Sequence, residues 1–406
     1  MNTLPYIRGK MNERGKKTPR RETFFLSFIF ISLFYACPVQ SVNISVEIYG
    51  DKPVKAAIFA PFTGRYIVQA DGKTIDTCAK GSVFEIGMMH DSVVLKAPGS
   101  MIGIFSEVHF RGCGDRNQFN IKPLAATATR LYDDALTATV NGTSLKLVNI
   151  VQAEHYIAGV IECEAGRRRP PEYFKVQAII CRTYALSNLA KHIADGFELC
   201  DGVHCQVYRG AATTSAVINA VSETKGMVLV DQNSQLIVAA FHSNCGGYTL
   251  NSEDVWSAPL PYLKAIRDTF CLNMPDARWE KTFPAEEWNS YLKKKEKNLK
   301  PDSLRREAYW DSIPECSRIF LYDRGYTIPL KEIRADLNLN STYFSIAKDG
   351  NEVTLHGRGF GHRIGLCQEG AMHMAQLGYN FRQILNFYYT GVQLIDYNIL
   401  PSSGFN

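Results

Sequence analysis

The sequence predicts an α+β fold in which a β-rich N-terminal region precedes a mixed α+β core. Before residue 150, short alternating or β-branched runs such as SVEIYG, KAAIFAPF and SLKLVNIV are separated by Gly, Asp, Asn and Pro, a pattern typical of strands. From residue 152, nonpolar residues recur with helical spacing. The 406 residues suffice for two or three domains, and we expect boundaries at 1–41, 42–130 and 131–406.

The first segment, 1–41, has the pattern of an export signal. Seven basic residues precede the apolar run FFLSFIFISLFYA, and this run is too short for a comfortable bilayer span. An uncleaved N-terminal anchor is the alternative. Cleavage at VQS before Val42 suits an ordinary signal peptidase, whereas FYA before Cys37 is a loose lipoprotein motif. We expect an exported protein of the cell envelope, periplasmic or lipid-anchored, that meets a membrane only through this segment.

The charge of the chain excludes one class of partner. Residues 1–41 hold seven basic and two acidic residues, a net +5 that equals the formal charge of the whole chain. The rest is therefore neutral, and nothing argues for nucleic-acid binding. The eleven cysteines are odd in number. Cys163 and Cys181 lie in apolar helical patterns, where free buried thiols are common, so we expect no disulfide framework.

Two helices are expected after the β-rich region. QAEHYIAGVIECEAG repeats nonpolar residues at helical spacing, and Gly166 is a natural C-cap residue for this helix. PPEYFKVQAIICRTYALSNLAKH begins with proline and is nonpolar around most of its circumference, which predicts a buried central helix. Lys175 and Arg182 are expected to share its polar stripe.

The second half alternates between strands, loops and helices. MVLVDQNSQLIVAAFHSNCGGYT predicts two strands around a turn and then a glycine-bearing loop. Residues 272–318 are charged and irregular, as expected for a surface helical insertion. The C-terminal part predicts a strand, EVTLHG, then a glycine-rich loop and a helix from about 367 to 377.

Glu164 is the first candidate for catalysis. It continues the nonpolar stripe of Ile157, Val160 and Ile161 by one more helical step, whereas Glu162 points away from that stripe. Burial and the C-terminal end of a helix both raise the pKa of a carboxyl group. A carboxyl that stays protonated near neutral pH suits a general acid for a glycosidic oxygen. The alternative is a structural glutamate paired with Arg182 or one of three arginines at 167–169.

A Cys/His cluster is the second candidate site. HIADGFELCDGVHC supplies two imidazoles and two thiols, enough for one tetrahedral zinc ion: His192, Cys200, His204 and Cys205. A Cys200–Cys205 disulfide remains the alternative. If zinc takes all four ligands, the site is closed and structural, because no position is left for water.

Two glycine-bearing loops complete the candidates. FHSNCGG places Ser243 and Cys245 near His242, but sequence neighbours rarely have triad geometry and there is no G-x-S-x-G elbow, so a nucleophile here is not favoured. HGRGFGHRIGLCQEGA matches neither the dinucleotide fingerprint nor a P-loop. Glycines are used where φ is positive or where a backbone or ligand comes close, which makes this a close-approach loop.

The sequence resembles the SpoIID/LytB family over about residues 130–406. The resemblance depends on the order and spacing of the blocks YIAGVIECEAG, FKVQAIICRTYAL, LCDGVHCQVY, FHSNCGGYT, VWSAPLPYL, IRADLNLNSTYFSI and GRGFGHRIGLCQEGAMHMAQLGYNFRQILNFYYTGVQL. The charged insertion is the part that matches least. This is the stage II sporulation protein D family of peptidoglycan lytic transglycosylases, which also includes proteins described as amidase enhancers.

The resemblance implies a core with a substrate groove and a cell-wall enzyme. Such an enzyme cleaves the β-1,4 bond between N-acetylmuramic acid and N-acetylglucosamine, favours peptide-stripped strands and leaves 1,6-anhydro ends. The family's catalytic glutamate falls on Glu164, and the zinc cluster of some members resembles the four Cys and His residues above. The residues that we expect to contact substrate are Gln177, Arg182, His242, Ser243, Gly359, His362 and Gln368.

The sequence leaves two alternative functions open. One is a non-catalytic wall-binding protein that stimulates a cell-wall amidase, and a weaker one is a zinc hydrolase at the Cys/His cluster. The chain also departs from the family pattern. Arg363 replaces the second glycine of G-H-G, Cys367 replaces a usual serine, and CEAG replaces S-E-M-P around Glu164. Arg363 is expected either to narrow the groove or to meet a charged substrate.

Overall fold

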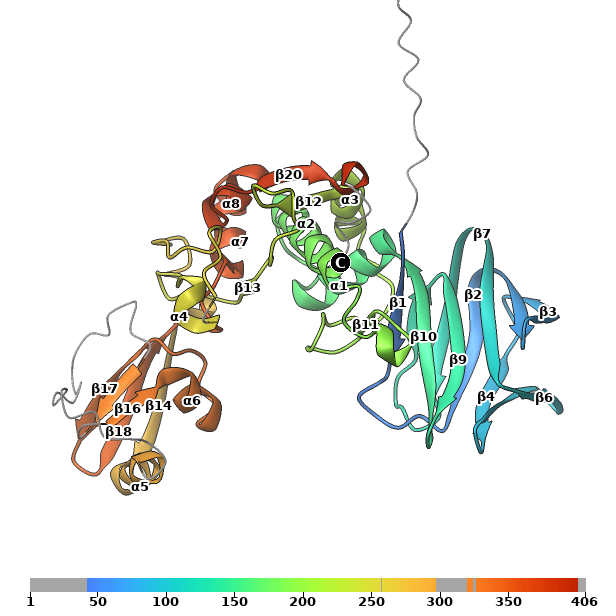
Figure 1. Ribbon diagram of the computed structural model, residues 1–406, viewed down its shortest axis with the longest axis horizontal. Coiled ribbons are helices and arrows are strands. Elements are labelled where there is room, and N and C mark those ends of the chain that lie inside the picture. Colours follow the sequence, from blue (N-terminus) through green and yellow to red (C-terminus); the bar gives the residue numbers. More distant parts are fainter. Residues whose placement is uncertain (1–41, 257, 297–319, 324–325, 401–406) are drawn as a thin grey trace, which may run out of the picture. The chain divides into compact units, whose positions relative to one another are not determined.

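An antiparallel sheet forms the N-terminal part of the protein in the computed structural model (Figure 1). The structure describes residues 42–256, 258–296, 320–323 and 326–400. The predicted export signal, both cleavage points and the end of the charged insertion lie outside these residues.

The sheet has eleven strands in the order β11-β1-β10-β9-β7-β2-β4-β5-β6, with β3 beside β2 and β8 beside β7. The strands are β1 (Asn43–Ile48), β2 (Ala56–Ala70), β3 (Lys73–Ala79), β4 (Phe84–Met89), β5 (Ser92–Ala97), β6 (Ser100–Phe105), β7 (Glu107–Pro123), β8 (Arg130–Asp133), β9 (Ala135–Asn141), β10 (Ser144–Gln152) and β11 (Leu199–Cys200). All pairs are antiparallel except β1 with β11. Because β9 and β10 belong to this sheet, it continues past the boundary that we expected at residue 130.

The strands form where the sequence alternates. In β1 every second residue is buried, so one face of the strand packs into the core and the other stays partly exposed. Phe59, Phe110 and Phe119 stack within that core, with ring centroids of the first two 3.8 Å apart. Nonpolar burial of this kind explains why the β-rich region was predictable from alternation alone.

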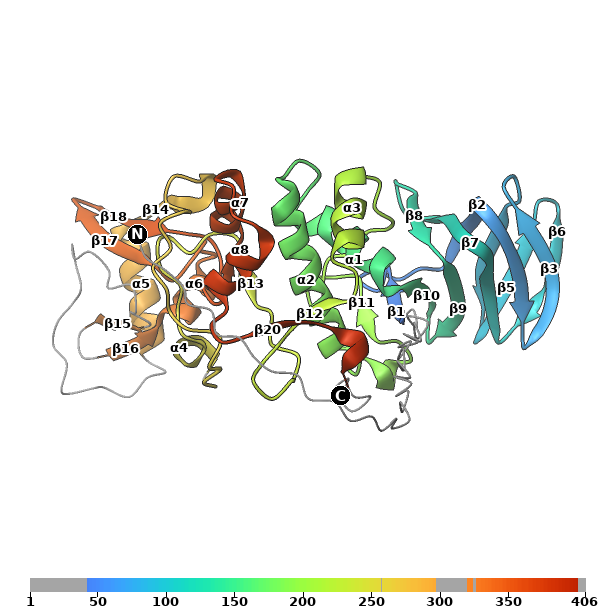
Figure 2. The same cartoon turned by 90° about the horizontal axis from the view of Figure 1, so that it is seen from above.

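Three helices and a two-stranded sheet follow (Figure 2). The helices are α1 (Ala153–Glu164), α2 (Pro171–Ser187) and α3 (Ser215–Glu223), and the strands are β12 (Met227–Val230) and β20 (Gln393–Asp396). Twelve of the seventeen residues of α2 are buried, which confirms the expected central helix. It packs against α1, α3, β12 and two C-terminal helices, α7 (Gln368–Gln376) and α8 (Phe381–Tyr388).

Arg182 joins these elements. Its side chain on α2 is fully buried and forms a two-pronged ion pair with Glu154 of α1, at 3.0 and 2.6 Å. A third nitrogen donates to the carbonyl of Met227 in β12 at 2.9 Å. The paired geometry and the extra carbonyl compensate for burying a guanidinium group. Lys175 lies on the partly exposed side of the helix, so the predicted stripe of Lys175 and Arg182 is wrong for Arg182.

A second nonpolar core begins in the region that we expected to be a surface insertion, 272–318, and continues beyond it. Its described elements are β14 (Arg278–Pro284), α5 (Ala285–Glu296), β15 (Phe320–Asp323), β16 (Tyr326–Pro329), α6 (Leu330–Asp336), β17 (Phe344–Asp349) and β18 (Glu352–Arg358). Trp288 and Leu292 of α5 are buried against Leu355 and its neighbours. Strand β14 pairs with β18 along its whole length. The prediction of a surface helix missed these contacts, because the nonpolar residues are sparse among charges.

The remaining described elements are short. They are β13 (Phe241–His242), β19 (Leu366–Cys367), α4 (Ser252–Trp256) and the 3-10 helices η1 (Ile193–Asp195), η2 (Pro275–Ala277) and η3 (Tyr397–Ile399). The second strand that we expected after β12 is reduced to a bridge between Val230 and Leu236. The helix expected at about 367 to 377 is confirmed as α7.

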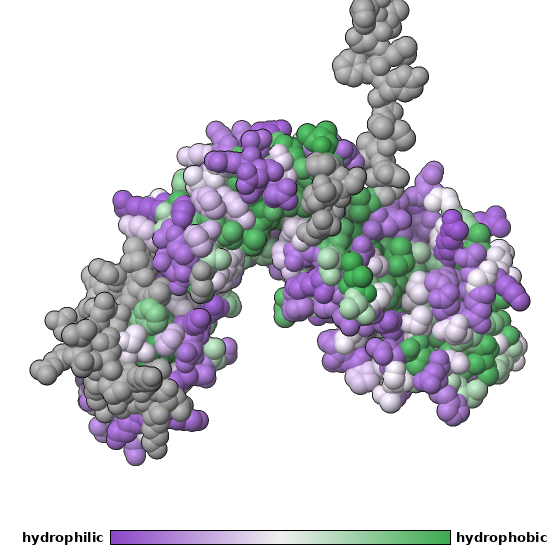
Figure 3. Space-filling view, viewed as in Figure 1, coloured by the Kyte–Doolittle hydropathy of each residue, from purple (hydrophilic) through white to green (hydrophobic). Residues whose placement is uncertain are grey.

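Within the described residues, no helix is both long and nonpolar enough to cross a bilayer. On the face in Figure 3, hydrophilic residues are interspersed with smaller hydrophobic patches.

Candidate active site

Glu164 ends helix α1, as its position in the stripe predicted. Ala165 is the C-cap residue, one position before the expected Gly166, and Gly166 follows it in the left-handed region with a φ of 76°. The backbone N–H of Val207 donates to Glu164 Oε1 at 3.1 Å. Within the described residues, Glu164 forms no ion pair, so neither Arg182 nor residues 167–169 neutralise it.

The chain reaches Glu164 because two glycines let it pass close to α1. A Cβ on Gly159, within the helix, would lie 2.6 Å from the ring of Tyr208 and would also collide with the carbonyl of Gly210. Gly210 has a φ of 130° and lies directly against the carbonyl of Leu131. These contacts fix the segment that carries Val207 against the C-terminal half of α1.

Burial raises the pKa of Glu164 above its ordinary value, and the Val207 N–H opposes this rise. Glu162 has the opposite environment. Its carboxylate accepts hydrogen bonds from the backbone N–H groups of Thr213 and Thr214 and pairs with Arg167 at 2.7 Å. The net effect lowers the pKa of Glu162, although its partial burial opposes this. The pKa values of these two glutamates, two residues apart on α1, are therefore shifted in opposite directions, which is a common arrangement in acid–base sites.

A buried chain of polar groups lies beside Glu164. The thiol of Cys181 on α2 is close enough for the Glu164 charge to raise its pKa, although burial is the main cause. This thiol also donates weakly to Gln177 Oε1 at 3.9 Å, and Gln177 Nε2 donates to the Tyr173 hydroxyl at 2.9 Å. Gln368 of α7 lies close to Tyr173, and its buried Nε2 has no hydrogen-bond partner among the described residues. Gln177, which we expected to bind substrate, is fully buried. A contact between Gln368 and substrate stays a prediction.

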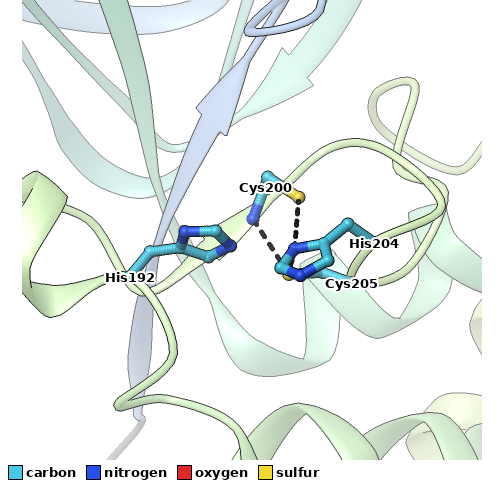
Figure 4. Close-up of side chains that lie close together, drawn as sticks. All are labelled: His192, Cys200, His204 and Cys205. Atoms are coloured by element: carbon cyan, nitrogen blue, oxygen red, sulfur yellow. Dashed lines mark hydrogen bonds between the residues drawn. The ribbon is translucent and has the colours of Figure 1, made fainter.

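The four Cys and His side chains of the second candidate site come together (Figure 4). Their ligand atoms all lie within 4.8 Å of one another. Nδ1 of His204 is 4.0 Å from the sulfur atoms of both Cys200 and Cys205, and the rings of His192 and His204 are 5.2 Å apart. Cys200 and Cys205 are free thiols here, so the alternative disulfide is not formed.

The chemistry of this cluster fits a zinc ion. Nδ1 of His192 is 3.2 Å from the carboxylate of Asp195, whereas its buried Nε2 has no hydrogen-bond partner among the described residues. A histidine that gives one nitrogen to a carboxylate and leaves the other free is the usual form of a zinc ligand. Strand β11 also pairs Cys200 with Glu47 of β1, so the cluster is anchored to the large sheet.

The glycine-rich loop is explained by packing within the chain. A Cβ on Gly359 would lie 2.5 Å from the carbonyl oxygen of Asn244, and one on Gly361 would lie 2.6 Å from His242 Cβ. Gly365 lies against the carbonyl of Ala240, and Gly357 against the Trp279 ring. The segment that approaches this bare backbone is therefore the other glycine-bearing loop of the same chain. A contact between Gly359 and substrate stays a prediction.

His242 and His362 lie side by side at the junction of these loops, with ring centroids 5.4 Å apart. His242 is buried, and its Nδ1 is 3.1 Å from the carbonyl of Ile364. Nδ1 of His362 accepts from the N–H of Ile364 at 3.1 Å, and burial lowers the pKa of His362 to about 4. Burial also lowers the pKa of His242, so both rings are shifted toward the neutral form. Within the described residues, no hydrogen bond or ion pair joins His362 to Glu164.

Ser243 is not arranged as a nucleophile. Its hydroxyl donates to a carboxylate oxygen of Asp276 at 2.6 Å, and no histidine accepts from it among the described residues. Asn244 next to it donates to Glu369 at 2.7 Å. This geometry agrees with the low weight given to serine chemistry.

Two arginines differ from expectation. Arg182 is fully buried with its nitrogens bonded inside the protein, so its role here is structural and not contact with substrate. Arg363 is also fully buried, donates to the carbonyls of Cys245 and Tyr248, and lies 4.1 Å from the centre of the Tyr343 ring. It neither narrows a groove nor meets a charged substrate. Its φ of 68° lies in the left-handed region, which residues other than glycine rarely adopt.

Sequence reasoning missed the segment that approaches Glu164. Val207 acts through its backbone N–H, which every residue except proline has, so its identity gives no signal. Gly159 does carry a signal. Glycine lowers the stability of a helix, so a glycine within a helix often marks a place where another segment packs closely. Its position in the middle of YIAGVIE pointed to such a contact.

The fold and these sites define an α+β protein with one half-buried glutamate at a helix end and a nearby Cys/His cluster. The family model described as SpoIID, Stage II sporulation protein, matches residues 141–230, which contain both. Stage II sporulation protein D of Bacillus subtilis is 30% identical over 297 residues, covering 69% of this chain and 85% of that protein. The protein therefore belongs to the SpoIID family.

Two further relatives show the range of names in the family. Stage II sporulation protein D of Bacillus amyloliquefaciens is 26% identical over 300 residues, covering 69% of this chain and 85% of that protein. The amidase enhancer of Bacillus subtilis is 29% identical over 294 residues, covering 59% of this chain and 40% of that protein.

The close packing of the glycine loop predicts a difference between two glycines. Both glycines have a positive φ. A methyl group added at Gly359 would press against the Asn244 carbonyl, whereas one added at Gly350, where φ is 54°, would have no atom within 4 Å. Gly350→Ala should cost about 1–2 kcal/mol for backbone strain, and Gly359→Ala about 1–3 kcal/mol more for overpacking. Urea unfolding of both variants measures this difference, and equal losses of stability would contradict the packing account.

Proposed function

We propose that the protein is a peptidoglycan lytic transglycosylase that uses Glu164 as its general acid and base. The observation that carries this proposal is the half-buried Glu164 carboxyl, whose pKa is raised by burial and which no cation neutralises among the described residues. Membership of the SpoIID family supports the same reaction. The substrate would be the β-1,4 bond between N-acetylmuramic acid and N-acetylglucosamine in glycan strands, with peptide-stripped strands preferred.

One carboxyl group is enough for this chemistry. Hydrolytic glycosidases need a second carboxylate as base or nucleophile. Here the protonated Glu164 gives its proton to the glycosidic oxygen as the bond from C1 to that oxygen breaks. The C6 hydroxyl of the same muramic acid attacks C1, and the Glu164 carboxylate takes the hydroxyl proton. The attacking group is already attached to the sugar, so no water has to be positioned. The low pKa and the bonding of Glu162 leave it without a role in these steps.

The Cys/His cluster would hold a structural zinc ion in this proposal. His192, Cys200, His204 and Cys205 would occupy all four ligand positions, so the ion would contribute stability and no open site for water. The segment that follows Cys205 directly carries Gln206 and Val207, and Val207 donates to Glu164. The cluster would thus fix the backbone donor that faces the catalytic carboxyl.

A second candidate function is a non-catalytic partner of a cell-wall amidase. The observation that favours it is the similarity to a protein named amidase enhancer, of which this chain spans 40%. Both functions place the protein in the cell envelope after export, which accords with the predicted N-terminal signal. They differ in whether the Glu164 carboxyl is needed.

Glu164→Gln should abolish cleavage of purified glycan strands and Glu162→Gln should not. Loss of a general acid lowers rates by about 10²–10⁴-fold, whereas Glu162 can keep its hydrogen bonds from Thr213 and Thr214 through an amide oxygen. The measurement is the rate of strand cleavage, with and without stem peptides, by liquid chromatography and mass spectrometry. Equal activity of the wild type and Glu164→Gln would refute the role of Glu164. No cleavage by the wild type would favour the amidase-enhancer function.

The pH profile should report the protonated form of Glu164. A general acid works only while it holds its proton, so kcat/KM should fall as the pH rises through the pKa of Glu164. Because burial raises that pKa, the fall should occur at a higher pH than for an ordinary glutamate. The measurement is kcat/KM across the pH range on one glycan substrate. A fall at the ordinary value of a solvated carboxyl would contradict the burial argument.

Removing one ligand should release the proposed zinc. Cys200→Ser should lower the zinc content by one ion per chain and lower the melting temperature, because a structural zinc contributes directly to folding. Cys113→Ser, at an exposed thiol outside the cluster, is the matched control. Metal analysis and thermal unfolding measure both effects. A Cys200–Cys205 disulfide in the purified wild type would exclude zinc at this site.

A further inference from the structure

Four more side chains with metal-binding atoms meet in the protein, away from the first cluster. They are Cys245, Asp268, Cys271 and Cys367, and their ligand atoms lie within 4.8 Å of one another. They come from three segments that are far apart in the sequence. Cys245 lies in the loop after β13, Asp268 and Cys271 lie in the connection before η2, and Cys367 is the N-cap of α7.

We propose that Cys245, Asp268, Cys271 and Cys367 bind one zinc ion as a second, structural metal site. The spacing of the atoms fits this ion. A zinc–sulfur distance of about 2.3 Å places two thiolates of a tetrahedral site about 3.8 Å apart. Here the sulfur atoms of Cys245 and Cys271 are 3.4 Å apart, and Cys245 Sγ is 3.3 Å from Asp268 Oδ2. A set of this size holds a single ion.

Burial gives a second reason for a bound cation. All four residues are fully buried, including the carboxylate of Asp268. Within the described residues, no Lys, Arg or His forms an ion pair with Asp268, and its partners are the Tyr388 hydroxyl, the Phe270 N–H and the Cys245 thiol. A buried carboxylate without a cation is costly, and a divalent ion supplies the missing charge.

The surroundings of the four residues support them as ligands. The backbone N–H groups of Cys245 and Gly370 donate to Cys367 Sγ at 3.3 and 3.4 Å, and the Tyr388 hydroxyl donates to Asp268 Oδ2 at 2.9 Å. Bonds of this kind orient the ligands of metal sites and offset the charge of thiolates. Gly370 also has to be glycine, because a Cβ there would lie 2.5 Å from Asp268 Oδ2.

Zinc binding accounts for the three cysteines and Asp268 better than a disulfide does. A Cys245–Cys271 disulfide would consume two thiols and leave Cys367 and the buried Asp268 carboxylate unexplained. Binding zinc uses all four groups, and each thiol that becomes a thiolate releases its proton to solvent. With four protein ligands the ion has no open position, so its role is structural. It would fasten the loop of His242 and Ser243 to the start of α7.

The test is the metal content of the purified reduced protein. Cys271→Ser/Cys367→Ser should hold one zinc fewer per chain than the wild type, and Cys78→Ser, at a buried thiol outside the cluster, should hold the same number as the wild type. Peptide mapping of the wild type should find no disulfide among Cys245, Cys271 and Cys367. Equal zinc in the wild type and the double variant, or a Cys245–Cys271 disulfide in the wild type, would overturn the proposal.

If the Cys271→Ser/Cys367→Ser variant does not fold, a second measurement tests the same site. The Cys200→Ser/His204→Ala chain lacks two ligands of the first cluster but retains the second. Loaded with cobalt(II), it should show absorption from sulfur-to-cobalt charge transfer. Absence of this absorption in the folded chain would overturn the proposal. Neither measurement depends on glycan cleavage, so the outcome is independent of the proposed transglycosylase activity.

Discussion

The close approach of residues 206–210 to helix α1 is the constraint on which the candidate site depends. Gly159 and Gly210 permit this approach, because a side chain at either position would collide with neighbouring backbone. The approach half-buries Glu164 and brings the Val207 N–H to its carboxylate. The same segment continues from the Cys/His cluster, which β11 ties to the large sheet. A carboxyl with a raised pKa is thus the product of backbone packing and not of a charged neighbour.

Local pattern was enough to predict the elements around Glu164. Nonpolar spacing in α1 placed Glu164 on its inner face, Gly166 marked the end of the helix, and proline marked the start of α2. The Cys/His cluster was also predictable, because its members lie within fourteen residues of one another and share a chemistry. In these cases the information is carried by neighbours in the sequence.

Contacts between distant segments could not be predicted. Arg182 looked like part of a polar stripe, but its partner Glu154 is on another helix and buries it. The glycine-rich loop suggested a bound ligand, whereas the segment around Asn244 fills the space. Cys245 and Cys367 are 122 residues apart, with Cys271 between them, so their cluster emerges only in three dimensions. The charges of 272–318 likewise hid the buried Trp288.

In the proposed reaction, Glu164 works as one carboxyl group that forms no ion pair among the described residues, which suits an intramolecular displacement. The direct measurement is digestion of purified glycan strands by the wild-type protein in water enriched in oxygen-18, followed by mass spectrometry of the new ends. Attack by the C6 hydroxyl predicts 1,6-anhydro ends with no oxygen-18. Reducing ends that carry one oxygen-18 would show that water attacks C1, and would contradict a mechanism in which Glu164 acts without a second carboxylate.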